Sequence, residues 1–146
     1  MNERYIRQTM IPEIGEAGQE KLKNAKVLIV GIGGLGSPIS LYLTAAGVGQ
    51  IGLIDDDIVS SSNLQRQILY TEAEIGQSKV ECACRRLSAL NSSTRFETYP
   101  NRFTSDNADR LVSTYDIIVD GCDNAATRYL IDDVCSCFKK PYVYGA

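Results

Sequence analysis

The chain has 146 residues, 44% of them hydrophobic and 23% charged, which fits one soluble globular domain with an ordinary core. The formal net charge of −3 argues against a nucleic-acid partner. No stretch reaches the roughly 18 apolar residues that a membrane span requires, so we expect no membrane association. The polar start, Met1 to Arg4, lacks the apolar segment of a signal peptide, and we expect a cytoplasmic protein.

The chain contains five cysteines and no histidine. An odd number of cysteines without Cys-x-x-Cys spacing predicts small, buried or half-buried thiols rather than a disulfide framework. The absence of histidine excludes Ser-His-Asp and Cys-His catalysis, and every His-ligated metal site. Any chemistry therefore depends on carboxylates, Lys, Arg, Tyr, Cys, backbone dipoles or a bound ion.

The first third of the chain is expected to form an arm, a short helix, a strand and a second helix. We expect residues 1–15 to be irregular and residues 16–24 to form a short polar helix. Residues 26–30 are apolar and rich in β-branched side chains, which is typical of a buried parallel strand. The helix that follows is expected to be capped by Ser37 and to end near Gly47.

The rest of the chain continues this alternation. The expected elements are a strand over 51–55, a short helix from about Asn63, a long helix over 75–90, a strand over 95–99, a helix capped by Ser105 and ending near Val112, a strand over 116–120, a helix over 125–138 and a last strand over 141–144.

Alternating strands and helices predict an α/β fold, namely a Rossmann-like doubly wound sheet that is mainly parallel, with strand order 3-2-1-4-5. The ligand crevice of such a sheet lies at the carboxyl ends of its strands. We divide the chain into an N-terminal arm with its short helix, residues 1–25, and a Rossmann-like domain, residues 26–146. No closing helix follows the last strand, so we expect this domain to be truncated before its second half.

The segment Gly31-Ile32-Gly33-Gly34-Leu35-Gly36 joins the first strand to the first long helix. Glycines let the backbone approach a phosphate, and the helix start offers free N–H groups to it. The alternative is a tight turn that binds no ligand. We expect Gly31, Gly33, Gly34 and Gly36 to contact a nucleotide.

Four charged residues extend this nucleotide site. Asp55 ends the second predicted strand, where a carboxylate commonly binds a ribose hydroxyl. Arg66 and Lys79 are cations that a plain dinucleotide site does not need, and Asp123 is an anion that suits a metal ion. Cations and Mg²⁺ supply most of the stabilisation in phosphoryl chemistry, so the set predicts a site for Mg-ATP.

Each of these residues also has a simpler interpretation. Arg66 and Lys79 taken separately are ordinary surface cations. A lone Asp123 suits a helix N-cap. Asp56 fits a solvated acidic loop, whereas Asp57 is a candidate for holding a metal or a partner.

Six motifs together resemble the ThiF/MoeB/HesA family, the bacterial relatives of ubiquitin-activating enzymes. They are Arg4-Tyr5-x-Arg7-Gln8, Gly31-x-Gly33-Gly34-Leu35-Gly36, Asp55-x-Asp57, Ser62-Asn63-Leu64-Gln65-Arg66-Gln67, Gly76-x-x-Lys79 and Cys122-Asp123-Asn124. The resemblance covers nearly the whole chain. The acidic triplet at residues 55–57 is closer to the ThiF branch of thiamine biosynthesis than to MoeB.

The resemblance implies ATP-dependent adenylation of the C-terminal glycine of a ubiquitin-like sulfur-carrier protein. The carrier is expected to be of the ThiS type, with the MoaD type of the molybdopterin pathway as the alternative. Family members continue past residue 146 into a part that holds zinc sites and the catalytic-cysteine loop. None of the five cysteines of this chain is therefore assigned that catalytic role.

The resemblance also gives each site residue a role. Gly34 lies under the phosphates, Asp55 binds the ribose and Asp123 binds Mg²⁺. Arg66 and Lys79 bind the phosphates, and Arg7 reaches the triphosphate across the interface of a homodimer. The same motifs mark further nucleotide contacts at Asp57, Asn63 and Gln67.

The expected chemistry suits a chain without histidine. The nucleophile is a terminal carboxylate with a pKa of about 3.5, so it is ionised at neutral pH and needs no general base. Two other classes of function stay open. An NAD-dependent dehydrogenase explains the glycines and Asp55 but leaves Arg66, Lys79 and Asp123 without a role. A nucleotide-binding module without turnover explains all of them.

Overall fold

A computed structural model gives the structure of residues 3–145, whose centre is a five-stranded sheet. The strand order is β3-β2-β1-β4-β5, and all neighbouring strands are parallel. The strands are β1 (Lys26–Val30), β2 (Gln50–Ile54), β3 (Arg95–Tyr99), β4 (Ile117–Asp120) and β5 (Tyr142–Tyr144). The predicted order, direction and Rossmann-like class are confirmed.

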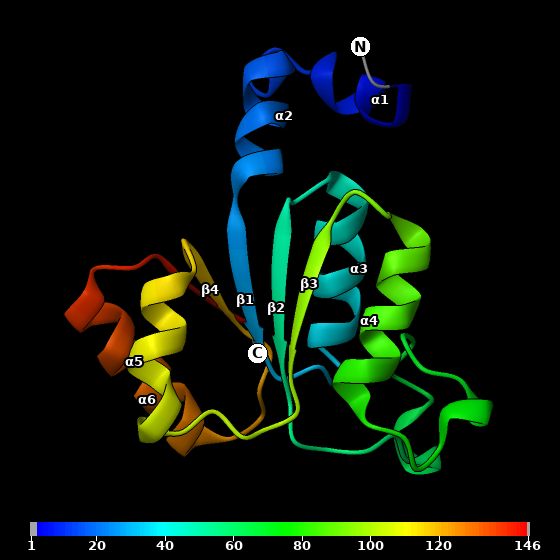
Figure 1. The fold of residues 1–146 in the computed structure, drawn as a ribbon, viewed down its shortest axis with the longest axis vertical. Coiled ribbons are helices and arrows are strands. Elements are labelled where there is room, and N and C mark those ends of the chain that lie inside the picture. The colour runs from blue at the N-terminus through cyan, green and yellow to red at the C-terminus, as the bar shows by residue number, and fades with distance from the viewer. Residues whose placement is uncertain (1–2, 146) are drawn as a thin grey trace.

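Helices cover both faces of this sheet (Figure 1). One face carries α3 (Gly36–Ala46) and α4 (Lys79–Leu90), and the other carries α5 (Ser105–Thr114) and α6 (Ala125–Phe138). Successive residues of a strand point to opposite faces, so the buried Ile29 packs with the α3–α4 layer and the buried Leu28 with the α5–α6 layer. Each face therefore has its own apolar core.

From residue 3 onward the N-terminal arm is helical rather than irregular, and the prediction for residues 1–2 lies outside the described residues. It contains a 3-10 turn η1 (Glu3–Tyr5), a short helix α1 (Ile6–Thr9) and the predicted polar helix α2 (Gly15–Asn24). The expectation of irregular structure was wrong for these residues because tertiary contacts order them. The Tyr5 hydroxyl accepts a hydrogen bond from Asn91 Nδ2 at 2.8 Å, and Gln8 Nε2 donates to the Ala46 carbonyl at 3.1 Å.

The long helix predicted over 75–90 begins later, at Lys79. Gly76 has a φ of 88°, a left-handed conformation that no helix continues through. Ser78 then pairs with Ile58 in an isolated antiparallel bridge. Two 3-10 turns precede the helix, η2 (Ser61–Asn63) and η3 (Glu72–Glu74). The end of α3 is as predicted, with Gly47 as its left-handed C-cap at φ 89°.

Both predicted serine caps were wrong by one or two residues. The N-cap of α3 is Leu35, and Ser37 lies buried inside the helix. The N-cap of α5 is Thr104, which forms a capping box with Asn107 and leaves Ser105 as the first helical residue.

All five cysteines are free thiols in this structure. Cys82 and Cys135 are buried, Cys84 and Cys122 are half-buried and Cys137 is exposed. Within residues 3–145, no helix has both the length and the apolar composition needed to cross a membrane.

Candidate functional site

A cleft of about 590 Å³ lies along the carboxyl ends of the strands. It brings together residues from the loops after β1, β2, β3 and β4, which are far apart in the sequence. The predicted site residues that line it are Gly31, Gly33, Gly34, Asp55, Asp57, Asn63, Arg66, Gln67, Lys79 and Asp123. Gly36 and Arg7 do not line it.

The glycines of the loop after β1 have two different roles. Gly31 has a φ of 86°, and a Cβ atom there would lie 3.0 Å from the backbone of Cys122. A Cβ atom on Gly36 would collide with the Gly31 carbonyl, so Gly36 allows close packing behind the loop rather than contact with a ligand. Gly33 and Gly34 face the cleft, where a Cβ atom on Gly34 would lie 3.6 Å from Arg66.

The Asp55 carboxylate connects two loops of the cleft. Its Oδ2 accepts a hydrogen bond from the Ile32 N–H at 2.7 Å, and its Oδ1 accepts one from the Asp57 N–H at 2.9 Å. Each carboxylate oxygen keeps a second lone pair. Asp55 is therefore held in place by the backbone and can still accept a hydrogen bond from a ribose hydroxyl.

Two cations lie on the wall of the cleft opposite α5 and α6. The Lys79 side chain is only 4% exposed, and its Nζ lies 3.1 Å from Asp57 Oδ2. Arg66 is exposed, and its Nη1 lies 3.4 Å from the Ser62 carbonyl, a long hydrogen bond. A buried, paired cation and an exposed one thus flank the glycine loop, and both attract an anionic ligand.

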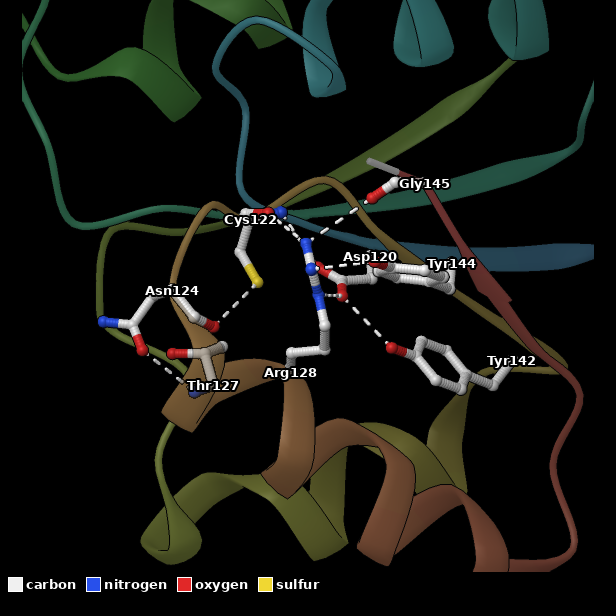
Figure 2. Close-up of polar contacts among 8 residues, drawn as sticks. All are labelled: Asp120, Cys122, Asn124, Thr127, Arg128, Tyr142, Tyr144 and Gly145. Atoms are coloured by element: carbon white, nitrogen blue, oxygen red, sulfur yellow. Dashed lines mark hydrogen bonds and ion pairs between the residues drawn. The ribbon is translucent and has the colours of Figure 1, made fainter.

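Asp123 is not the N-cap of α6. That position belongs to Asn124, whose Oδ1 accepts a hydrogen bond from the Thr127 N–H at 3.1 Å (Figure 2). Within residues 3–145 the Asp123 carboxylate has no hydrogen-bond or ion-pair partner, and it lines the cleft. An exposed, unpaired carboxylate at this place fits a ligand of Mg²⁺, which prefers oxygen donors.

The acidic triplet offers a second set of oxygens, but these already have partners. Ligand atoms of Asp55, Asp56 and Asp57 lie within 4.8 Å of one another. Asp55 accepts two backbone hydrogen bonds, Asp56 pairs with a cation and Asp57 pairs with Lys79. Asp123 is therefore the better candidate for the metal.

A buried ion pair fixes the loop that carries Asp123 (Figure 2). Asp120 is fully buried and accepts hydrogen bonds from the Cys122 N–H at 2.9 Å, from Arg128 Nε at 3.0 Å and from the Tyr142 hydroxyl at 3.1 Å. The Arg128 guanidinium also donates to the Cys122 carbonyl at 3.0 Å. The loop is thus tied to β4, β5 and α6, which keeps Asp123 at the edge of the cleft.

Cys122 lines the cleft but is poorly suited to act as a nucleophile. Burial, together with a hydrogen bond to Asp120, raises the pKa of its thiol to about 11. The thiol is therefore protonated at neutral pH, and the thiolate is the reactive form.

The sequence analysis missed one wall of the cleft, formed by residues 101–103. Arg102 pairs with Asp56 there, with Nη2 lying 3.2 Å from Asp56 Oδ2. These residues belong to no recognised motif. Their position directly after β3 was the available signal, because it matches that of Asp55 after β2.

Arg7 lies far from the cleft within its own subunit. It belongs to α1, which lies at the opposite end of the sheet from the carboxyl ends of β1 and β2 (Figure 1). The hydrogen bonds of Tyr5 and Gln8 order this arm without a second subunit. Any contact between Arg7 and a bound nucleotide therefore requires another copy of the chain.

The sequence of this chain matches a known protein family and several of its members. The sequence model of the ThiF family matches residues 5–146. A sulfur carrier protein adenylyltransferase from Thermus thermophilus is 49% identical over 144 residues, which are 99% of this chain and 53% of that protein. The adenylyltransferase and sulfurtransferase MOCS3 of Culex quinquefasciatus is 52% identical over 143 residues, which are 98% of this chain and 33% of that protein. The chain thus spans about half or less of these relatives.

A solved structure has the same fold and contains a nucleotide. The tRNA N6-threonylcarbamoyladenosine dehydratase TcdA of E. coli, in complex with ATP, superposes with a TM-score of 0.91 and 29% sequence identity. The match covers 97% of this chain and 58% of that one. Another protein with this fold therefore forms a complex with ATP.

Proposed function

This chain belongs to the ThiF family, and on that premise we propose that it is the ATP-binding part of an adenylyltransferase. Its substrate is the C-terminal glycine of a sulfur-carrier protein, and the reaction takes place in the cytoplasm. The observation that carries this proposal is the cleft in which Arg66, Lys79 and the unpaired Asp123 surround the glycine loop. The names of two relatives, both adenylyltransferases and one of them acting on a sulfur carrier, support the same reaction.

In the proposed reaction, a carboxylate oxygen of the carrier attacks the α-phosphorus of ATP. The new bond joins this oxygen to phosphorus, and the bond from phosphorus to the bridging oxygen breaks, so pyrophosphate leaves with the electron pair. Carboxylate and triphosphate repel each other. Arg66 and Lys79 reduce this repulsion and stabilise the leaving pyrophosphate. Asp123 would hold Mg²⁺, which supplies further positive charge to the phosphates when it is bound.

The other half of the site binds and orients the nucleotide. Asp55 accepts hydrogen bonds from the ribose, while Gly33 and Gly34 let the backbone N–H groups at the start of α3 approach the phosphates. We place Asn63 and Gln67 against the phosphates as well, because both line the cleft beside the glycine loop. No residue of the chain has to remove a proton, since the attacking carboxylate is already ionised.

Carrier-dependent ATP–pyrophosphate exchange in the full-length protein tests this proposal. We expect exchange with a ThiS-type carrier, weaker exchange with a MoaD-type carrier and none without a carrier. Stronger exchange with the MoaD type would move the assignment to the molybdopterin pathway. Binding of ATP without exchange on either carrier would leave a nucleotide-binding module in place of the enzyme.

We further propose that the protein is a homodimer in which Arg7 completes the site of the other subunit. The exposed apolar side chains of Ile6, Met10 and Ile11 flank Arg7 and offer a surface for a second copy. The planar guanidinium of Arg suits phosphate oxygens, which it binds two at a time. Symmetric pairs are also the commonest soluble oligomers.

Mixing two inactive variants tests the role of Arg7. Arg7→Ala and Asp123→Ala subunits are each expected to be inactive, and both are expected to dimerise. If Arg7 acts across the interface, mixed dimers contain one intact site and recover part of the exchange activity. Mixed dimers that form and stay inactive would show that Arg7 does not act in this way.

A further inference from the structure

The proposed function implies where the base of the nucleotide lies, and the inference below rests on it. Asp55 binds the ribose in the middle of the cleft, and the phosphates extend toward Gly33 and Gly34. Because base and phosphates leave the ribose in different directions, the base extends away from the glycine loop. The sheet order places β3 beyond β2 on that side, so the loop after β3 borders the base.

The floor of this end of the cleft is apolar. Val30, Ile54 and Phe103 all line the cleft, and all belong to the core cluster beneath α5 and α6. Each is at most 4% exposed, so the core holds these side chains in place. This apolar floor suits a planar apolar ring and does not suit a charged group.

Arg102 and Asp56 bridge the two loops at the rim above this floor. Both Nε and Nη2 of Arg102 approach Asp56 Oδ2, at 3.3 and 3.2 Å. The Arg102 backbone is fixed on one side by Asn107, whose Nδ2 donates to the Arg102 carbonyl at 2.9 Å, and on the other by the buried Phe103. One edge of the guanidinium is thus held by Asp56, while 69% of the Arg102 side chain stays exposed.

We propose that Arg102 is a base-binding residue that closes the base end of the cleft by stacking its guanidinium on a purine ring. The ring lies between the apolar floor and the flat cation, and Asp56 orients the cation through its edge. Guanidinium groups stack well on π systems, and a guanidinium is more weakly hydrated than the ammonium of lysine. Arg102 therefore recognises the base, whereas Arg66 and Lys79 recognise the phosphates.

Binding measurements on the unmodified chain and its variants test this assignment without any carrier protein. ATP, AMP and tripolyphosphate are titrated by calorimetry in the presence of Mg²⁺. Arg102→Ala is expected to weaken the binding of ATP and of AMP by the same factor, roughly 3- to 30-fold. The affinity for tripolyphosphate is expected to stay unchanged. Arg102→Lys keeps the charge without the flat surface, and we expect it to lose as much affinity as Arg102→Ala. Asp56→Asn is expected to show the same pattern with a smaller factor.

Arg110→Ala, an exposed arginine on α5 outside the cleft, is the matched control and is expected to change nothing. Unchanged affinities in Arg102→Ala would overturn the inference. So would a loss that is larger for tripolyphosphate than for AMP, or full affinity in Arg102→Lys, since both indicate a simple charge effect. If the expected pattern holds but no carrier supports exchange, the inference stands and the proposed function falls. If ATP does not bind to the unmodified chain, both fall.

Discussion

The two ends of the sheet differ in whether some of their polar side chains are left without a partner in the fold. At the amino ends of the strands, Tyr5, Gln8 and Asn91 pair with the chain itself through buried or half-buried hydrogen bonds. At the carboxyl ends, Arg66 makes only one long hydrogen bond and Asp123 has no partner within residues 3–145. The amino end uses these side chains to stabilise the fold. The carboxyl end combines paired groups, such as Asp120 and Arg128, with charged groups that stay available for a ligand.

This contrast separates the residues that stabilise the fold from those that act on a ligand. A hydrogen-bonded polar group contributes to the stability of the fold. When a substitution removes this group, its former hydrogen-bond partner is left unsatisfied. An unpaired, exposed charge contributes little to folding, so it can be changed without loss of stability. Substitution of a paired residue at the amino ends is therefore expected to lower stability and leave ligand binding unchanged. Substitution of an unpaired charge at the carboxyl ends is expected to do the reverse.

The largest effect is expected for Asp123→Asn. Loss of the metal ligand should reduce exchange activity of the full-length protein by about 100-fold or more, as expected when a group that stabilises transition-state charge is removed. The melting temperature should stay unchanged, because this side chain has no partner in the fold. Exchange kinetics and thermal unfolding measure the two quantities.

Asp133→Asn is the matched control for that experiment. Asp133 is an exposed carboxylate on α6, outside the cleft, and its replacement is expected to affect neither activity nor stability. Normal exchange in Asp123→Asn would remove this residue from the mechanism and would break the contrast between the two ends.

Lys79→Met sharpens the comparison, because Lys79 is both buried and in the cleft. ATP affinity should fall by about 10- to 100-fold when this cation is removed from the phosphates. The free energy of unfolding should change by less than about 1 kcal/mol, since the ion-pair partner Asp57 is 68% exposed and remains hydrated. Calorimetric titration measures the ATP affinity, and urea unfolding measures the free energy of unfolding. Lys21→Met at the amino end is the control; an equal loss of ATP affinity there would contradict the assignment.

Asn91→Ala tests the amino end. Asn91 Nδ2 donates to the Tyr5 hydroxyl and to the Thr44 carbonyl, and the residue is 1% exposed. Its removal should cost about 1–3 kcal/mol of unfolding free energy, while ATP affinity stays the same. Ser92→Ala, at the exposed neighbouring position, should be neutral in both urea unfolding and titration. A loss of ATP affinity without a loss of stability would reverse the proposed contrast.

The smallest effect concerns pH. The Cys122 thiol has a pKa of about 11 in the fold, against an ordinary value of 9.0. Between these values the unfolded chain loses the proton and the folded chain keeps it, so stability falls as the pH rises from 9 to 11. Cys122→Ser is expected to lessen this fall in melting temperature, and Cys137→Ser, at an exposed position, is expected to leave it unchanged. Equal pH profiles for both variants would contradict this explanation.

The local pattern of the sequence was sufficient to predict most of the fold. Apolar β-branched runs ending at glycine or aspartate predicted β1, β2 and β4, and their alternation with helices predicted the strand order. The start of α4 was missed because the bridge between Ile58 and Ser78 is a tertiary contact that leaves no periodic signal. Predicting α3 and α5 was easier than assigning their caps, since several serines and threonines compete for each position.

The site was predictable only where a motif marks it. The cleft contains nearly all of the predicted nucleotide contacts, because those residues lie in motifs at strand ends. Arg102 was missed, since a single arginine in a loop has no distinctive pattern. The place of Gly36 behind the loop, and of Arg7 at the other end of the sheet, required the three-dimensional structure.

The most direct test of the cleft at the carboxyl ends is a comparison of two nucleotides. ATP and NAD are titrated into the chain in the presence of Mg²⁺, and binding is followed by calorimetry. Arg66, Lys79 and Asp123 favour a reacting triphosphate, so ATP is predicted to bind more tightly than NAD. Tighter binding of NAD would contradict this account, because it would leave these three charged residues without a ligand.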